Sequence, residues 1–119
     1  MVDTRPVNNN PLIWYRELVR FSLDTGTAPG IAERREELSR SSLTIAQIKE
    51  LEDLDDEAIE IVLDSPFIDA DLMADDNKKP LAKWWWHLGK IRSHTYPAEL
   101  LPEHLRAVYD EQATGRLAA

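Results

Sequence analysis

The residues best suited to acid–base or metal chemistry lie close together near the end of the chain. His87 and His94 are seven positions apart, and Tyr96 follows two positions later. On one helix, two turns would separate the histidines by about 10 Å, whereas two helical ligands of one metal are best spaced roughly three or four residues apart. His104 falls in another segment, and no evident nucleophile is nearby. We therefore expect a protein that is not an enzyme and has no cofactor.

Acidic residues form a second group whose types could bind a cation, a row that contains Asp69, Asp71, Asp75 and Asp76. A helix-flanked calcium loop also needs a central glycine and a closing glutamate, and both are missing here. The chain contains no cysteine, which excludes disulfides and thiolate metal sites. The sequence predicts no metal site.

Three consecutive tryptophans, Trp84, Trp85 and Trp86, are the most unusual feature of the chain. They fall in residues 80–92, which we predict to be a helix that begins at a proline. Neighbouring helix residues lie about 100° apart, so three of them span about 200°. A surface helix buries an apolar stripe only a little wider than about 100°. We therefore expect at least one indole to face a second partner.

The helical wheel places Trp86 on the polar side of this segment, beside Lys83 and Lys90. Tryptophan is enriched among the residues that dominate protein interfaces. We predict a partner-binding face made of Trp85, Trp86, Lys83, His87 and Lys90, with Trp86 as its anchor. The alternative is that another helix of the same domain covers Trp86. Gly89, between the last two rings on the wheel, suggests a close backbone approach by another helix.

Charge separates along the chain and suggests a second use for the same region. Residues 33–76 have fifteen acids and four bases, whereas residues 77–98 have no acid at all. Bases alternating with aromatic rings are typical of single-stranded nucleic acid binding. The contacts to an anion or nucleic acid would be Lys78, Lys79, Arg92, His94 and Tyr96. This alternative is less favoured, because the net charge of −8 opposes nonspecific nucleic acid binding.

The acidic stretch offers two further interpretations. Residues 50–76 could complement the basic face, within the chain or in a second copy. They could also imitate nucleic acid and block a protein that binds it. The composition indicates a soluble domain: 43% of the 119 residues are hydrophobic, and no apolar run approaches the roughly 18 residues of a membrane span. We expect no membrane contact and a cytoplasmic location.

The first predicted helix spans residues 10–24, with Asn10 as its cap and Pro11 at its first position. Its apolar positions cover about 200° of the wheel and predict a central core helix. These positions are Leu12, Trp14, Tyr15, Leu18, Val19, Phe21 and Leu23.

The remaining pattern predicts several short helices. Residues 31–40 are rich in charge and indicate a solvated helix or connection. Thr44 and Gln47 form a capping box that starts a helix over residues 44–53, and Asp55 caps another over residues 55–64. Further helices are expected from Pro66 to about residue 74, over residues 80–92, and from residue 102 to 113.

No β-alternation appears, so we predict an all-α fold, a compact orthogonal array of six or seven short helices without a sheet. Residues 1–9 form a flexible arm, residues 10–113 a single helical domain, and residues 114–119 a frayed tail. The predicted function is a non-catalytic protein–protein interaction module: an adaptor, an accessory subunit or a small inhibitor of a larger assembly. The expected partner is another protein or a second copy.

Overall fold

The computed structural model describes residues 10–23, 28, 30–65, 68 and 72–118, with side chains described as far as residue 110. Within these ranges the chain is helical and has no β-strand, which confirms the all-α prediction. The described residues form five α-helices rather than six or seven. They are α1 (Leu12–Glu17), α2 (Ile31–Ser39), α3 (Ile45–Asp64), α4 (Leu88–Arg92) and α5 (Glu103–Ala118). Three shorter helical segments are η2 (Leu18–Ser22), η4 (Trp84–Trp86) and η5 (Ala98–Leu100).

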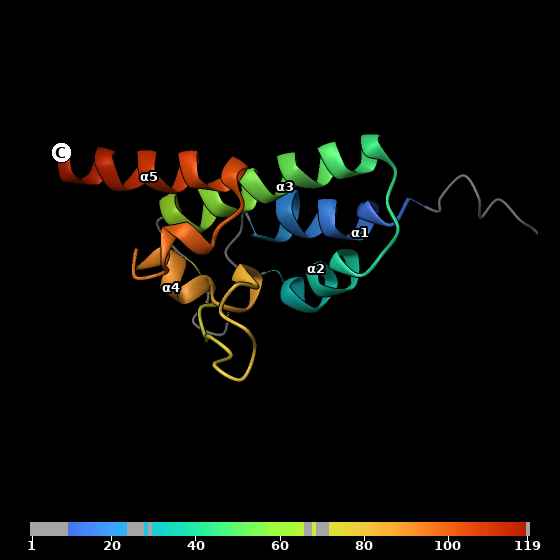
Figure 1. The fold of residues 1–119 in the computed structure, drawn as a ribbon, viewed down its shortest axis with the longest axis horizontal. Coiled ribbons are helices and arrows are strands. Elements are labelled where there is room, and N and C mark those ends of the chain that lie inside the picture. Colours follow the sequence, from blue (N-terminus) through green and yellow to red (C-terminus); the bar gives the residue numbers. More distant parts are fainter. Residues whose placement is uncertain (1–9, 24–27, 29, 66–67, 69–71, 119) are drawn as a thin grey trace, which may run out of the picture.

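The longest helix, α3, is the centre of the fold. It contacts α1, α4 and α5, while α2 packs against α1 and against η4. Figure 1 shows α1, α3 and α5 running roughly along the long axis of the molecule, so these three do not cross at right angles as an orthogonal array would. Among the described helices, none is both long and apolar enough to cross a membrane.

Asn10 hydrogen-bonds at the start of the first helix as predicted, but the helix begins one residue later than expected, at Leu12, and presents a different face to the core. Asn10 Oδ1 accepts a hydrogen bond from the Leu12 amide at 3.0 Å, and Pro11 directly precedes the helix. After α1 the chain continues as the π-helical segment η2. Trp14 and Phe21, both predicted to pack inward, are 61% and 69% exposed. Only the narrower arc of this helix that lies against α2 and α3 is buried. The prediction from the wide apolar stripe therefore assigned too many residues to the core.

The two helices predicted over residues 44–64 are one continuous helix, α3. The capping box is confirmed: the Gln47 amide donates to Thr44 Oγ1 at 3.1 Å, and Gln47 Oε1 accepts from the Thr44 amide at 2.9 Å. No glycine or proline interrupts the helix before Ser65. The predicted cap Asp55 lies inside the helix and is buried, because its carboxylate binds side chains from α1 and α2. A helix break at this residue was therefore a wrong prediction.

The predicted helix over residues 80–92 is also wrong in its first half. Trp84–Trp86 form one turn of 3₁₀-helix, and α4 starts only at Leu88. His87 separates the two with backbone angles of φ −132° and ψ 42°, outside the helical region. A 3₁₀-helix has about three residues per turn, so adjacent tryptophans point in three directions around it.

The ends of the other elements differ less from the prediction. α3 ends at Asp64, directly before the Ser65-Pro66 pair, and α5 continues past residue 113 to Ala118. The helix expected from Pro66 lies largely outside the described residues. The predicted solvated segment over residues 31–40 is α2, and it packs on the core through Ile31, Arg35 and Leu38.

Candidate interaction site

A buried ionic junction joins α1, α2 and α3 beneath the tryptophans. Arg35 donates from Nε and Nη2 to the two oxygens of Asp55, each at 2.9 Å, and the Tyr15 hydroxyl donates to Asp55 Oδ1 at 2.7 Å. Asp55 is only 1% exposed, so its charge depends on these partners. Burial raises the pKa of Tyr15 well above 10, and the Asp55 charge raises it further. Burial alone would lower the pKa of Arg35, but its hydrogen bonds and charge pairing with Asp55 raise it overall.

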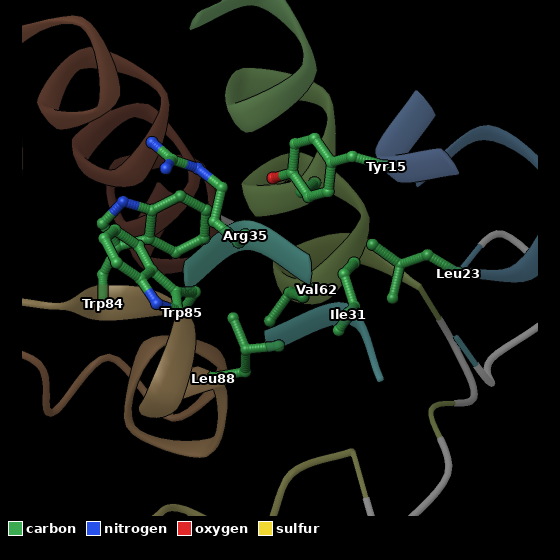
Figure 2. Close-up of a pocket in the computed structure, with 9 residues that line it drawn as sticks. Tyr15, Leu23, Ile31, Arg35, Val62, Trp84, Trp85 and Leu88 are labelled. Carbon is green, nitrogen blue, oxygen red and sulfur yellow. The ribbon is translucent and has the colours of Figure 1, made fainter. Parts of the chain in front are cut away.

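The junction also positions the first two tryptophans. The Arg35 guanidinium lies 4.6 Å from the ring centre of Trp85 and 5.8 Å from that of Trp84. The two indoles meet edge to face at 5.7 Å. Cation–π and edge-to-face contacts both favour this arrangement. Figure 2 shows Arg35 beside Trp84 and Trp85 at one side of a small cavity.

That cavity is not a substrate pocket. Besides the junction residues, it is lined by apolar side chains of the core, and Figure 2 shows these around it: Leu23, Ile31, Val62 and Leu88. It has room for about one water molecule, whereas small-molecule sites are typically several hundred Å³. Among the described residues, no group of three or more histidines, aspartates and glutamates could hold a metal ion.

Glu36 fastens the second and third tryptophans to α2. Its Oε1 accepts from Trp85 Nε1 at 3.1 Å and from Trp86 Nε1 at 2.9 Å, and its Oε2 pairs with Lys83 Nζ at 2.7 Å. These hydrogen bonds, the one from Lys83 first, lower the pKa of Glu36 to about 2. Only Trp84 is fully buried, and the other two indoles stay partly exposed. One interior therefore does not enclose all three rings, although α2 covers part of the remaining surface.

Residues 77–83, which we call the lysine loop, project from the fold directly before the tryptophans. Figure 1 shows this segment as the loop that extends from the lower edge of the molecule. Residues 77–82 are all exposed, six in a row. Lys78 and Lys79 form no ion pair within the described part of the chain, and Lys79 Nζ lies 4.8 Å from the ring centre of Trp86. The loop therefore presents positive charge next to an aromatic ring.

Two buried side chains hold the backbone of the lysine loop. His87 Nε2 donates to the Pro80 carbonyl at 3.2 Å, and the Tyr96 hydroxyl donates to the Leu81 carbonyl. Their exposed fractions are only 2% and 3%. Burial raises the pKa of Tyr96 to about 12, so its hydroxyl remains a donor across the ordinary pH range.

The start of the loop is held from α4. Lys90 Nζ donates to Asn77 Oδ1 at 2.8 Å, lies 3.5 Å from His87 Nδ1, and pairs with Asp75 at 3.5 Å. Asp75 in turn accepts from the Gly89 amide at 2.9 Å. A Cβ on Gly89 would clash with the Met73 carbonyl oxygen. The close backbone approach predicted for Gly89 therefore exists, but the approaching segment is not a helix.

The predicted contact residues divide into two sets. Lys83, Trp85, Trp86 and Lys90 are gathered around Glu36 and the lysine loop, with part of each still accessible. His87 lies in the interior and supports the loop from beneath, so it is removed from the predicted contact face. The two outermost lysines of the predicted anion site, Lys78 and Lys79, are exposed on the same loop.

The other three residues of the predicted anion site point into the fold. Arg92 donates to the carbonyls of Val62 and Ser65 at 2.6 and 2.8 Å. His94 stacks on Tyr109 at 4.7 Å and hydrogen-bonds its carbonyl. Tyr96 is buried. These three side chains join structural elements rather than face solvent together.

Sequence reasoning missed the residues that organise this site, above all Arg35 and Glu36. Their signal is weak, because both lie in a run of charges that resembles a solvated helix. Sequence reasoning also missed the exposed pair Trp14 and Phe21, whose apolar character predicted burial.

Comparison with known proteins finds no matching family model, no similar curated protein and no similar solved structure.

Proposed function

We propose that this protein is a non-catalytic interaction module that docks an acidic surface of another protein on its lysine loop and the accessible edge of Trp86. Such a module would act as an adaptor, an accessory subunit or an inhibitor of a larger assembly. The observation that carries the proposal is a stretch of six consecutive exposed residues, 77–82, whose backbone is held by buried side chains.

The fixed backbone matters because ordering a loop on binding costs conformational entropy. Here His87, Tyr96 and Lys90 already restrain the loop in the free protein. The three internal anchors therefore reduce the entropy that the loop would lose on docking. Restraint of this kind is expected where the shape of a loop is used in recognition.

The charge of the loop favours an acidic partner. Lys78 and Lys79 are exposed, and the stretch from residue 77 to 98 contains no acid. Lys79 beside Trp86 supplies a cation next to an apolar ring, a combination that suits the edge of a protein interface. Because the chain as a whole is acidic, a local basic site would favour partners with a matching acidic patch over nonspecific polyanions.

Nucleic acid is the second candidate, and the same pair of Lys79 and Trp86 favours it, because a base could stack where the ring is accessible. Against it, three of the five residues predicted to contact an anion are used inside the fold. Mimicry of nucleic acid by the acidic residues 50–76 is only weakly supported. Glu50, Asp55 and Glu57 of this stretch already pair with arginines of the same chain, so their charge is partly neutralised.

The test is a fluorescence titration of the purified protein with a poly-aspartate peptide and, separately, with a single-stranded oligonucleotide at low salt. Trp86 serves as the reporter. The informative variant is Lys78→Glu with Lys79→Glu. The matched control is Arg40→Glu with Lys49→Glu, which changes the net charge equally at exposed positions away from the loop.

The proposal expects poly-aspartate to bind, with affinity reduced about tenfold or more by the loop variant and far less by the control. Binding of the oligonucleotide with no binding of poly-aspartate would favour the nucleic acid alternative. Equal losses in the two variants would mean that net charge, not the loop, governs binding, and would overturn the proposal.

A further inference from the structure

The anchors of the lysine loop meet at His87, whose two ring nitrogens face opposite kinds of group. Nε2 faces the Pro80 carbonyl at 3.2 Å, and a carbonyl can only accept. Nε2 must therefore carry a proton. Nδ1 faces the ammonium of Lys90 at 3.5 Å, and an ammonium can only donate. Nδ1 must therefore offer a lone pair, so the arrangement fits a neutral imidazole in a single tautomer.

Lys90 connects that imidazole to the start of the loop. Three acceptors surround its ammonium: Asn77 Oδ1 at 2.8 Å, Asp75 Oδ2 at 3.5 Å and His87 Nδ1 at 3.5 Å. An ammonium has three donors, so each acceptor has one to match. The loop is thus held by Lys90 at Asn77 and by His87 at Pro80, and these two anchors contact each other, because Lys90 Nζ lies 3.5 Å from His87 Nδ1.

From this geometry we infer that His87 is a positioning residue that holds the lysine loop in its binding shape only while its ring is neutral. A proton on Nδ1 would remove one of the three acceptors of Lys90 and set two positive charges about 3.5 Å apart beside the buried ring. Lys90 would move away and release Asn77. This inference rests on the proposed function for its biological meaning, but the change in the loop can be measured without any partner.

The other groups around His87 do not replace the lost contact. Asp75, the acid that pairs with Lys90, already accepts at Oδ1 from the amides of Gly89 and Lys90. Tyr96, whose ring centre is 6.4 Å from that of His87, keeps its proton and goes on holding Leu81. A charged His87 ring should therefore loosen residues 77–80 and leave the end of the loop attached.

The experiment measures amide hydrogen exchange of residues 77–83, corrected for intrinsic exchange, at pH 7.5 and at a lower pH at which the ¹⁵N shifts of the His87 ring show that it is charged. We expect exchange of residues 77–80 to be at least about tenfold faster where the ring is charged. Loop protection that does not follow the His87 titration would overturn the inference.

Two variants separate positioning from a general effect of pH. His87→Gln keeps a neutral donor for Pro80 and an acceptor for Lys90, so its loop should stay protected at both pH values. His104→Gln removes a histidine of α5 and should leave the pH response of the loop unchanged. If His87→Gln does not fold, Lys90→Met tests the same contact: without the ammonium, the pH response should shrink severalfold, and an unchanged response would contradict the inference.

Poly-aspartate binding measured over the same pH range distinguishes the two proposals. If the loop loosens but the protein binds no poly-aspartate, the proposed function is wrong and the role of His87 stands. If binding is lost with Lys78→Glu and Lys79→Glu but does not change when His87 is protonated, the proposed function stands and the role of His87 is wrong.

Discussion

All four tryptophans of this protein lie in two regions, which differ in how far the fold covers their indole rings. In η4 the indoles of Trp85 and Trp86 donate to Glu36, and Arg35 lies over Trp84 and Trp85. On the outer face of α1, Trp14 is 61% exposed. Arg34 lies 4.3 Å from its ring centre and pairs with the exposed Glu37. Adjacent arginines of α2 thus contact two different tryptophan environments: Arg35 lies over the partly buried cluster of η4, and Arg34 lies over the exposed Trp14.

A run of adjacent aromatic residues in the sequence therefore does not identify the most exposed aromatic surface of the fold. Three tryptophans in a row attract attention, yet each of them contacts other groups of the fold. Trp14 and Phe21 lie in an ordinary amphipathic pattern and are the most exposed rings described. Exposure depends on how far another element covers the face in question: α2 contacts η4 through several side chains, but Trp14 remains 61% exposed although Arg34 of α2 lies over its ring.

Truncation of one tryptophan in each region gives the largest expected contrast. Trp84→Ala removes a ring that is 2% exposed, and it should cost about 3–5 kcal/mol of unfolding free energy. Trp14→Ala removes an exposed ring and should cost less than about 1 kcal/mol, mainly the stacking of Arg34. Urea denaturation followed by circular dichroism measures both. Equal losses of unfolding free energy in the two variants would contradict the difference in burial between the two regions.

The two arginines provide the next contrast. Arg35→Ala leaves Asp55 buried with only the Tyr15 hydroxyl as a partner, and removal of one member of a buried ion pair costs about 3–5 kcal/mol. Arg34→Ala breaks an exposed pair with Glu37 and should cost about 0–1 kcal/mol. The same denaturation experiment compares them. A cost below about 1 kcal/mol for Arg35→Ala would mean that the junction does not contribute to stability as described.

The smallest expected effect concerns the fastening of η4 by Glu36. The folded pKa of about 2 lies below its ordinary value of 4.5, so ionised Glu36 stabilises the fold fully above that ordinary value. This contribution is lost as the pH falls from about 4.5 towards 2. Glu36→Gln should therefore lower stability at pH 7 by about 1–2 kcal/mol and by much less at pH 2.5. A constant difference between variant and wild type across this range would contradict the prediction.

Local signals in the sequence were sufficient for part of the fold. The Asn10 hydrogen bond to the Leu12 amide, the capping box of Thr44 and Gln47, and the end of α3 before Ser65-Pro66 all depend on neighbours within a few positions. The all-α class follows from the same kind of information, because hydrophobic periodicity and caps are local properties. For the candidate site, the segment around Trp86 and its lysines could be selected from residue type alone.

What could not be predicted depends on contacts between distant residues. Asp55 looked like a helix cap, and only the approach of Arg35, twenty positions away, explains why it lies within a continuous helix. His87 looked like part of a binding face, and only the path of the chain at Pro80 turns it inward. In each case the residue type suggested a local role for a polar side chain, but a hydrogen bond to another segment determines where that side chain lies.

The helical class, the capped helix starts and the positive charge on either side of the tryptophans can be predicted from the sequence, because these properties depend only on a residue and its near neighbours. Contacts between segments of the fold determine which aromatic rings are covered, how α2 binds η4, and how His87 and Tyr96 support the lysine loop. Burial and hydrogen bonding of a side chain are set by whatever segment packs against it, and no local pattern specifies that segment.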